Sequence, residues 1–272
     1  MVMRLYSVAV YLFLYVPIGI IVLFSFNSGR HASSFEGLSV EWYGKALSNP
    51  FVIESLTTSL IIALTAAFLS SLMGTAAALA LQRVRGPVKA LFDGLIYVSI
   101  MIPGIVIGIA TLVAFVTVFD LLNSVLGAVW PEGVKPPKLT LGYASVIAAH
   151  TLFTMSLVIL LVRARIAGMD RALIEASQDL YATPWQTFVQ ITLPQLFPAI
   201  LAGFLLSFTF SFDDFIISFF VAGPNTTLPI YVFASIRRGI TPEVNAIGTM
   251  VLGVSLTLLI LAQVLLRRKD QR

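Results

Sequence analysis

The sequence contains no cysteine among its 272 residues, which excludes disulfide bonds, thiolate metal sites and cysteine nucleophiles. It also lacks the GxxxxGK[ST] phosphate loop and the HExxH zinc motif, so we expect no ATP hydrolysis by this chain and no metal site. Charged residues make up only 11% of the chain, without a basic block of the nucleic-acid-binding type. These absences predict a protein that performs no covalent chemistry, holds no cofactor of its own and binds no nucleic acid.

The abundant feature is apolar sequence, because 58% of the residues are hydrophobic. Six stretches are each near the roughly 20 residues that a helix needs to cross a bilayer. They are residues 5–26, 55–81, 90–118, 140–162, 196–221 and 244–266. The pattern predicts an all-α, multi-pass membrane protein of six transmembrane helices, in which residues 1–272 form a single transmembrane domain.

The distribution of basic residues predicts the orientation of this domain. If the N-terminus is inside, eleven of the seventeen Lys and Arg residues lie in the cytoplasmic segments. The clusters at residues 83–89 and 267–272 adjoin the ends of predicted spans, where the positive-inside rule is strongest. We therefore expect both termini, and the polar segment 163–195, to lie in the cytoplasm.

That polar segment carries local signals for two short helices. Asp170 is placed to cap a first helix that starts at Arg171. Thr183, Pro184 and Gln186 occupy the N-cap, N1 and N3 positions of a capping box for a second helix. A helical hairpin over about residues 170–195 is therefore predicted, and on a protein otherwise in the membrane it is suited to contact a soluble partner.

The hairpin resembles the EAA loop of ABC-importer permease subunits, whose pattern is E-A-A, three residues, Gly, nine residues and I-x-L-P. The matching residues are Glu175, Ala176, Ile191, Leu193 and Pro194. Ser177 replaces the second Ala, and Tyr181 replaces the Gly that would permit a positive φ. The resemblance implies that these seven positions contact or shape an ATPase interface, while the geometry of the turn stays open. An interfacial amphipathic hairpin is the alternative.

The fifth span contains the sequence SFTFSFDDFIISFF at residues 207–220. In a continuous helix, a stripe of small and acidic residues lies beside a stripe of phenylalanines. The first stripe is Ser207, Ser211, Asp214 and Ser218, and the second is Phe208, Phe212, Phe215 and Phe219. A carboxylate facing lipid costs roughly 2.5–3.5 kcal/mol or more. Asp214, alone or together with Asp213, is therefore expected either to attract a transported cation or to form a structural pair. The phenylalanine stripe is interpreted as packing rather than as a cation contact.

Three further polar or helix-breaking positions lie in the membrane spans. Pro103 breaks the third span. The break either forms a gate or lining of the transport path or is a kink required by helix packing. His150 has no Glu or His at metal-binding spacing, so a polar packing role is expected. Asp93 is expected to face the interface or to pair with Arg85 or Lys89.

The C-terminal third narrows the resemblance to the second permease subunit of spermidine/putrescine ABC importers. The matching features are the acidic pair at 213–214, the Gly-Pro turn at 223–224, LPIYVF at 228–233 and TPEVNA at 241–246. The resemblance implies the type I ABC importer permease fold and a bacterial inner-membrane location. It also implies a second permease subunit, an extracytoplasmic substrate-binding protein and two ATPase subunits that bind ATP-Mg.

Three alternative functions are considered for this sequence. In the first, the same architecture carries another small organic solute, such as a phosphonate or an opine. A stand-alone ion-coupled carrier would need its own energy-coupling site and internal repeats, neither of which is evident. An intramembrane hydrolase would need separated carboxylates or a Ser–His pattern, whereas Asp213 and Asp214 are adjacent.

Overall fold

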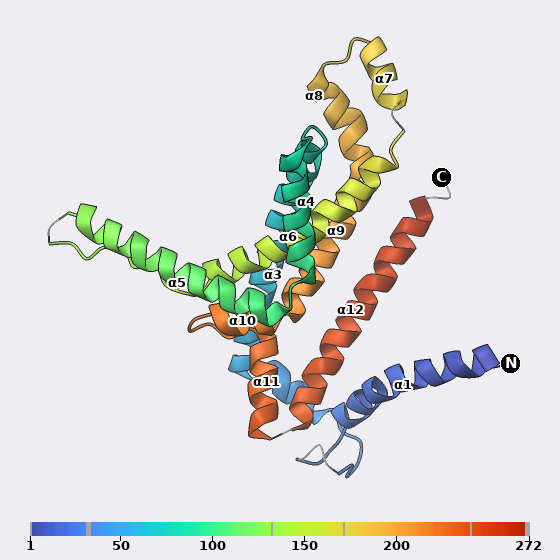
Figure 1. Ribbon diagram of the computed structural model, residues 1–272. Coiled ribbons are helices and arrows are strands. Elements are labelled where there is room, and N and C mark those ends of the chain that lie inside the picture. Colours follow the sequence, from blue (N-terminus) through green and yellow to red (C-terminus); the bar gives the residue numbers. More distant parts are fainter. Residues whose placement is uncertain (1, 31–33, 132, 171, 240, 270–272) are drawn as a thin grey trace. The chain divides into compact units, whose positions relative to one another are not determined.

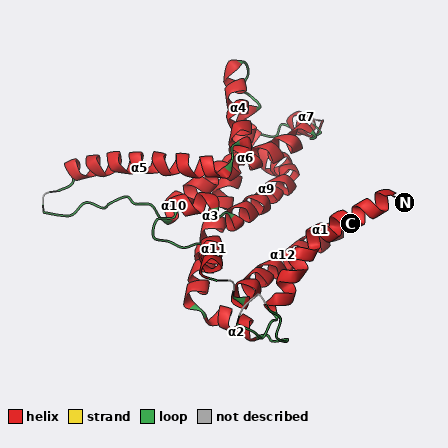
Figure 2. Cartoon of the chain, turned by 60° about the horizontal axis from the view of Figure 1, so that its bottom comes forward, coloured by secondary structure: helices red, strands yellow, loops and turns green. Residues whose placement is uncertain are grey.

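The computed structural model describes residues 2–30, 34–131, 133–170, 172–239 and 241–269, with side chains of the last helix described as far as Thr257. Within these ranges the chain consists of helices joined by loops, without a strand (Figure 2). The all-α prediction is therefore confirmed. The helices belong to two compact units, one made of Met1–Glu54 with Tyr231–Arg272 and the other of Ser55–Ile230.

The first unit joins the two ends of the chain. Its helices are α1 (Val2–Ser25), α2 (Glu41–Ser48), most of α11 (Leu228–Arg238) and α12 (Pro242–Lys269). Both α1 and α2 pack against α12. The Asn49 side chain donates to the Tyr231 hydroxyl at 3.1 Å and to Oε1 of Glu243 at 2.8 Å. Apart from its last residues, α1 is exposed throughout, which leaves an apolar surface for lipid or for another subunit.

The second unit contains the remaining long helices (Figure 1). They are α3 (Pro50–Leu81), α4 (Pro87–Met101), α5 (Gly104–Val129), α6 (Tyr143–Ala167) and α9 (Leu193–Asp213), and the short helix α10 (Ile216–Val221) follows α9. The helix α6 packs against α4, α9 and α10. It is the most buried of the candidate spans, so polar residues along it need partners within the protein.

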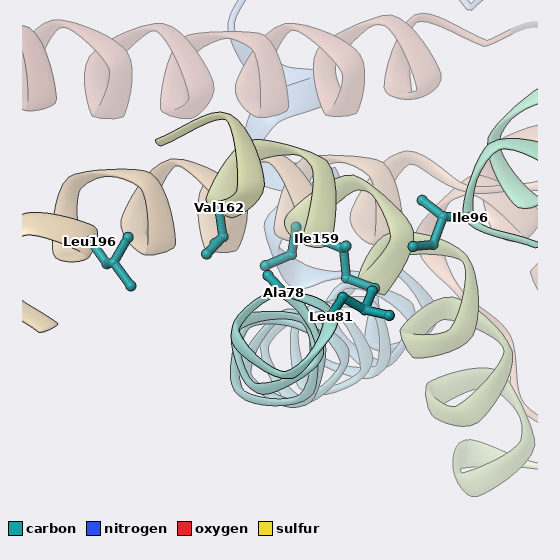
Figure 3. Close-up of a cluster of buried hydrophobic side chains, with 7 residues drawn as sticks. Ala78, Leu81, Ile96, Ile159, Val162 and Leu196 are labelled. Carbon is teal, nitrogen blue, oxygen red and sulfur yellow. The ribbon is translucent and has the colours of Figure 1, made fainter. Parts of the chain in front are cut away.

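Close packing around Val158 holds three helices of this unit together. A Cβ on Gly74 of α3 would lie 2.8 Å from Cβ of Val158, and one on Gly203 of α9 would lie 3.3 Å from its Cγ atoms. Glycine therefore lets α3 and α9 approach α6 from two sides, as small residues do between membrane helices. Next to this contact, Figure 3 shows apolar side chains from α3, α4, α6 and α9, namely Ala78, Leu81, Ile96, Ile159, Val162 and Leu196.

Five helices in the described parts of the chain are long and apolar enough to cross a membrane. They confirm the predicted first, second and fourth spans as α1, α3 and α6. The third span breaks where predicted, because Pro103 lacks an N–H and Ile102 before it is extended at ψ 133°. The second piece, α5, runs to Val129, so the predicted end at residue 118 was wrong.

The fifth span differs from the expectation of one helix over 196–221. The helix α9 ends at Asp213, Asp214 is extended with ψ 117°, and α10 starts at Ile216. The prediction of one continuous helix was therefore wrong. The predicted sixth span, 244–266, falls within α12.

Candidate functional site

The predicted hairpin is present at one end of the second unit, where Figure 1 shows α7 beside α8. Oδ1 of Asp170 accepts the backbone N–H of Ala172 at 2.9 Å, which confirms the predicted cap. The helix α7 runs over Ala172–Asp179, while Arg171, the expected first residue, lies outside the described residues. The short helix α8 follows at Pro184–Thr187 and contacts α7.

The capping box of α8 is also confirmed. The Thr183 hydroxyl accepts the Gln186 N–H at 3.3 Å, and the Gln186 side chain accepts the Thr183 N–H at 2.8 Å. Two backbone donors at the helix start are thereby satisfied by residues three apart. Because both bonds are local, the second helix of the hairpin starts without help from the membrane bundle.

The turn after α7 is a left-handed Schellman motif with tyrosine in the glycine position. Tyr181 has φ 59° and is the only non-glycine residue in the described ranges with a positive φ. Its N–H donates to the Gln178 carbonyl at 2.9 Å, and the Ala182 N–H donates to the Ser177 carbonyl at 3.0 Å. The geometry left open by the sequence is therefore the one that glycine would adopt, at a cost of roughly 1–2 kcal/mol for a side-chain-bearing residue.

The residues of the EAA-like pattern fall into three places on the hairpin. Glu175, Ala176 and Tyr181 are exposed, and Tyr181 is 95% exposed. Ser177 is buried instead, where its hydroxyl contacts the Thr187 hydroxyl at 2.9 Å and joins the two helices. Ser177 is thus an internal contact of the hairpin rather than part of its surface.

The last three residues of the pattern lie where the hairpin joins the membrane helix. Ile191 belongs to a π-helical turn over Phe188–Thr192, and Leu193 and Pro194 begin α9. Pro194 has no N–H to donate to an α-helical bond with Gln190, and such π-turns are often found at functional sites. These residues shape the joint of the hairpin, so they have a different position from the exposed residues on its helices.

A cleft of about 630 Å³, lined by both polar and apolar residues, separates the hairpin from the end of α3. Gln82 and Arg83 line it from the turn after α3, and Gln178, Thr187 and Phe188 line it from the hairpin. The hairpin is therefore attached to the bundle mainly through its own joint with α9 and has room beside it.

The acidic pair lies at the break between α9 and α10, where the two carboxylates have different surroundings. Asp213 is exposed, whereas the side chain of Asp214 is only 19% exposed. Oδ2 of Asp214 accepts the Ser218 N–H at 2.9 Å and lies 3.2 Å from Nε2 of His150. The chain leaves the helical conformation here because Asp214 turns toward these two donors, one of them an unsatisfied N–H in the first turn of α10.

His150, on α6, has the polar packing role expected from the sequence, but the partners of its ring were not predicted. It is 1% exposed, with Nδ1 lying 2.7 Å from the Ser211 hydroxyl and Nε2 lying 3.2 Å from the Ser218 hydroxyl. Three of the four predicted stripe residues, Ser211, Asp214 and Ser218, therefore gather around a histidine more than sixty residues earlier, whereas the buried Ser207 hydroxyl has no hydrogen-bond partner among the described residues. The available signal was the cost of burying an imidazole and a carboxylate in an apolar bundle unless each has a partner.

Pairs of phenylalanines lie on both sides of the helix break. Phe208 stacks on Phe212 with ring centroids 5.7 Å apart, and Phe215 contacts Phe219 at 5.4 Å. The prediction of a continuous stripe was wrong for the same reason as the continuous helix. Each pair packs within its own side of the break, in line with the packing interpretation.

Pro103 brings α5 against α10, the short helix after the acidic pair. A Cβ on Gly108 would lie 2.7 Å from the Phe220 ring, and Gly104 faces Ile216. Pro103 itself is exposed. Its roles as a gate or as a packing kink both stay predictions, but the break at Pro103 and the break at Asp214 lie on two helices in direct contact.

Asp93 pairs with a residue other than the two expected. Nη1 of Arg163, on α6, donates to Oδ1 of Asp93 at 2.5 Å. The expectation of Arg85 or Lys89 considered neighbours in sequence, whereas α4 packs along α6. The pair joins α4 to α6.

Long apolar helices, a polar hairpin at one end of a bundle and a buried polar cluster at a helix break together define a multi-pass membrane transport subunit. Residues 70–272 match the family described as binding-protein-dependent transport system inner membrane component. The chain belongs to this family, and it is therefore a multi-pass protein of the inner membrane. Membership also confirms the prediction of a transport subunit rather than an enzyme.

Two curated relatives match over most of their length. The spermidine/putrescine transport system permease protein PotC of Escherichia coli K12 is 34% identical over 267 residues, covering 98% of this chain and 94% of PotC. The putrescine transport system permease protein PotI of the same strain is 37% identical over 245 residues, covering 89% of this chain and 82% of PotI.

Solved structures support the fold. One is a bacterial ABC transporter involved in import of the acidic polysaccharide alginate, with a TM-score of 0.75 at 18% identity, covering 98% of this chain and 94% of that one. Another is an amino acid ABC transporter, with a TM-score of 0.57 at 20% identity, covering 85% of this chain and 100% of that one. The ABC importer permease fold is therefore shared although the sequences have diverged.

Proposed function

We propose that this chain is a permease subunit of an ATP-driven importer that carries polyamines such as spermidine and putrescine into the cell. The observation that carries the proposal is the identity of 34–37% with polyamine permeases over nearly the whole chain. An exposed carboxylate at the break of α9 is chemically suited to a cationic solute, because a carboxylate in a membrane protein needs a cavity, a partner or a ligand of opposite charge.

The hairpin is the proposed docking element for an ATPase. Three large apolar or aromatic side chains stand exposed on it: Leu180 at 82%, Tyr181 at 95% and Trp185 at 71%. Aromatic anchors of this kind are typical of protein interfaces. Glu175 and Ala176 lie on the exposed part of α7, and the π-turn joins the hairpin directly to α9.

The assembly that fits this element contains a second permease subunit, two ATPase subunits and an extracytoplasmic binding protein. Both termini and the hairpin then lie in the cytoplasm, as the basic residues indicate. ATP-Mg binds to the ATPases, and their closure moves the hairpin, so that the two permeases alternate the side on which the path is open. The exposed apolar surface of α1 is the proposed contact with the second permease or with lipid.

The test is uptake of radiolabelled putrescine and spermidine by proteoliposomes that contain this chain with its cognate permease, ATPases and binding protein. We expect uptake that requires ATP and the binding protein. Uptake by this chain alone would contradict the proposal, and so would labelling that places residues 170–195 on the outer face.

The solute is tested separately by identifying what the cognate binding protein retains when it is purified from cells. A diamine or triamine supports the proposal. A phosphonate, an opine or another organic solute would keep the importer architecture and overturn the substrate.

A further inference from the structure

Two adjacent carboxylates at one helix break have unequal surroundings. Asp214 is held by the Ser218 N–H at 2.9 Å and by Nε2 of His150 at 3.2 Å. Asp213, the last residue of α9, is exposed and has no hydrogen bond or ion pair with the described residues. Only one carboxylate of the pair is therefore unengaged.

The side chain of His150, which contacts Asp214, is deeply buried and fixed in orientation. His150 is 1% exposed, and its ring is fixed on the opposite side by the Ser211 hydroxyl, 2.7 Å from Nδ1. With a proton on Nε2, the imidazole donates to Asp214, and the Ser211 hydroxyl donates to Nδ1 of a neutral ring. A single planar side chain on α6 thus links the last turn of α9 to Asp214 beyond it.

This arrangement determines where α9 stops. If the helix continued, the Ser218 N–H would donate to the backbone carbonyl of Asp214. At the break it donates to the Asp214 carboxylate instead, and that carboxylate also contacts Nε2 of the buried His150, which would be costly to leave without a polar partner. Since the carboxylate of Asp214 is turned inward, the helix ends at Asp213. The exposed position of the Asp213 carboxylate therefore depends on the contacts of Asp214.

We propose that His150 is a positioning residue for transport: it engages Asp214 so that Asp213 is the carboxylate that meets the cationic solute. This rests on the proposed function for the identity of the solute. Asp214 then has a structural role, and its release from His150 and Ser218 would be needed before it could bind a cation.

Histidine offers two conservative replacements that separate its contacts. The amide nitrogen of Gln reaches about as far as Nε2 and can donate to Asp214, whereas that of Asn corresponds to Nδ1 and reaches only Ser211. We expect H150Q to preserve the position of Asp213 and H150N to lose it, although both keep a polar side chain at the same buried site.

The accessibility of residue 213 can be measured without a transport assay. Because the chain has no cysteine, a cysteine introduced at this position is the chain's only thiol. Asp213→Cys is labelled with a cationic methanethiosulfonate in the assembled importer, and the rate is compared in the wild-type, H150Q and H150N backgrounds. We expect the labelling rate of Asp213→Cys to change about tenfold in the H150N background, the factor that corresponds to about 1.4 kcal/mol. In the H150Q background the rate should change little. Thr209→Cys, one turn earlier and also exposed, is the matched control and should keep its rate in all three backgrounds.

Uptake of putrescine, normalised to the amount of assembled complex, tests the division of roles. We expect D213N and H150N each to lower uptake, and the double variant to be no lower than D213N. Multiplicative losses would overturn the inference, and so would equal labelling of Asp213→Cys in H150N and H150Q. Absence of polyamine uptake by the wild type would contradict the proposed function instead, and the labelling rates would still decide the positioning role.

Discussion

The helix ends at Tyr181 and at Asp214 both leave the helical conformation at a non-glycine residue, and they are supported in opposite ways. At the end of α7, Tyr181 takes a left-handed conformation within bonds that span at most five residues. At the end of α9, Asp214 is extended and is held in part by His150, 64 residues earlier. The hairpin is thus formed by its own sequence, whereas the break in the fifth span exists only when α6 is packed on α9. A change in the hairpin should therefore leave the bundle intact, and a change in the bundle should move the acidic pair.

The largest expected effect is on coupling through the hairpin. Glu175→Lys reverses a charge on the exposed part of α7, so ATP-dependent uptake should fall by at least roughly tenfold, the loss that about 1.4 kcal/mol of interface free energy gives. Uptake by proteoliposomes is the measurement, with the melting temperature of the purified chain as the control for folding. Asp179→Lys, an equal reversal at the other end of the same helix, is the comparison variant. Unchanged uptake with Glu175→Lys would remove Glu175 from the docking surface.

The next effect is on the bundle alone. In Gly74→Ala the new Cβ would meet Cβ of Val158 at 2.8 Å, and overpacking of this kind costs typically 1–3 kcal/mol. The melting temperature in detergent should fall. Gly127→Ala, on α5 with nothing within 4 Å, should instead raise it slightly, because alanine is the better helix former by roughly 0.5–1 kcal/mol. Equal shifts in the two variants would contradict the close approach of α3 to α6.

A smaller effect is expected at the cap of α8. Thr183→Ala removes the acceptor of the Gln186 N–H, at a cost of about 1 kcal/mol. Hydrogen exchange at residues 185–188 should accelerate while exchange in α6 stays the same. Thr183→Ser keeps the hydroxyl and should restore protection. Faster exchange throughout the bundle would show that the hairpin is less independent than its local bonds indicate.

The smallest effect is at the turn itself. Tyr181→Gly relieves a positive φ but adds chain entropy to the unfolded state, so the net stabilisation of the turn should be at most about 1 kcal/mol. Tyr181→Val should act in the opposite direction, because β-branched residues tolerate this conformation least. Protection of the Ala182 N–H, which bonds the Ser177 carbonyl, reports on both variants. The same sign for both would argue against strain at this position.

The contrast also explains which features the sequence could predict. Asp170, Thr183 and Gln186 act on neighbours within three residues, so their caps can be identified from spacing alone. Pro103 breaks its helix through its own missing N–H, and that break was also predictable. The spans could be identified from the length of each apolar stretch for the same reason, since each helix makes its backbone hydrogen bonds within its own segment.

The acidic pair was different, because its geometry depends on contacts between distant helices. Spacing placed Ser211, Asp214 and Ser218 on one side of a helix, which was useful but assumed that the helix continued. Neither the break nor the role of His150 follows from local pattern, since the imidazole comes from another helix. The partner of Asp93 was missed in the same way, because Arg163 is distant in sequence and adjacent in the bundle.

The contact of Val158 with Gly74 and Gly203 has a mechanical consequence. With a valine fitted closely between two glycines, α3, α6 and α9 have little freedom to slide past one another, so this trio should move as a block. Deformation during a transport cycle then concentrates where the backbone is already released from regular helix: the π-turn at 188–192, the junction at Pro103 and the extended Asp214. The subunit would therefore move as a rigid block of three helices with three flexible points, two of which adjoin the contacting helices α5 and α10.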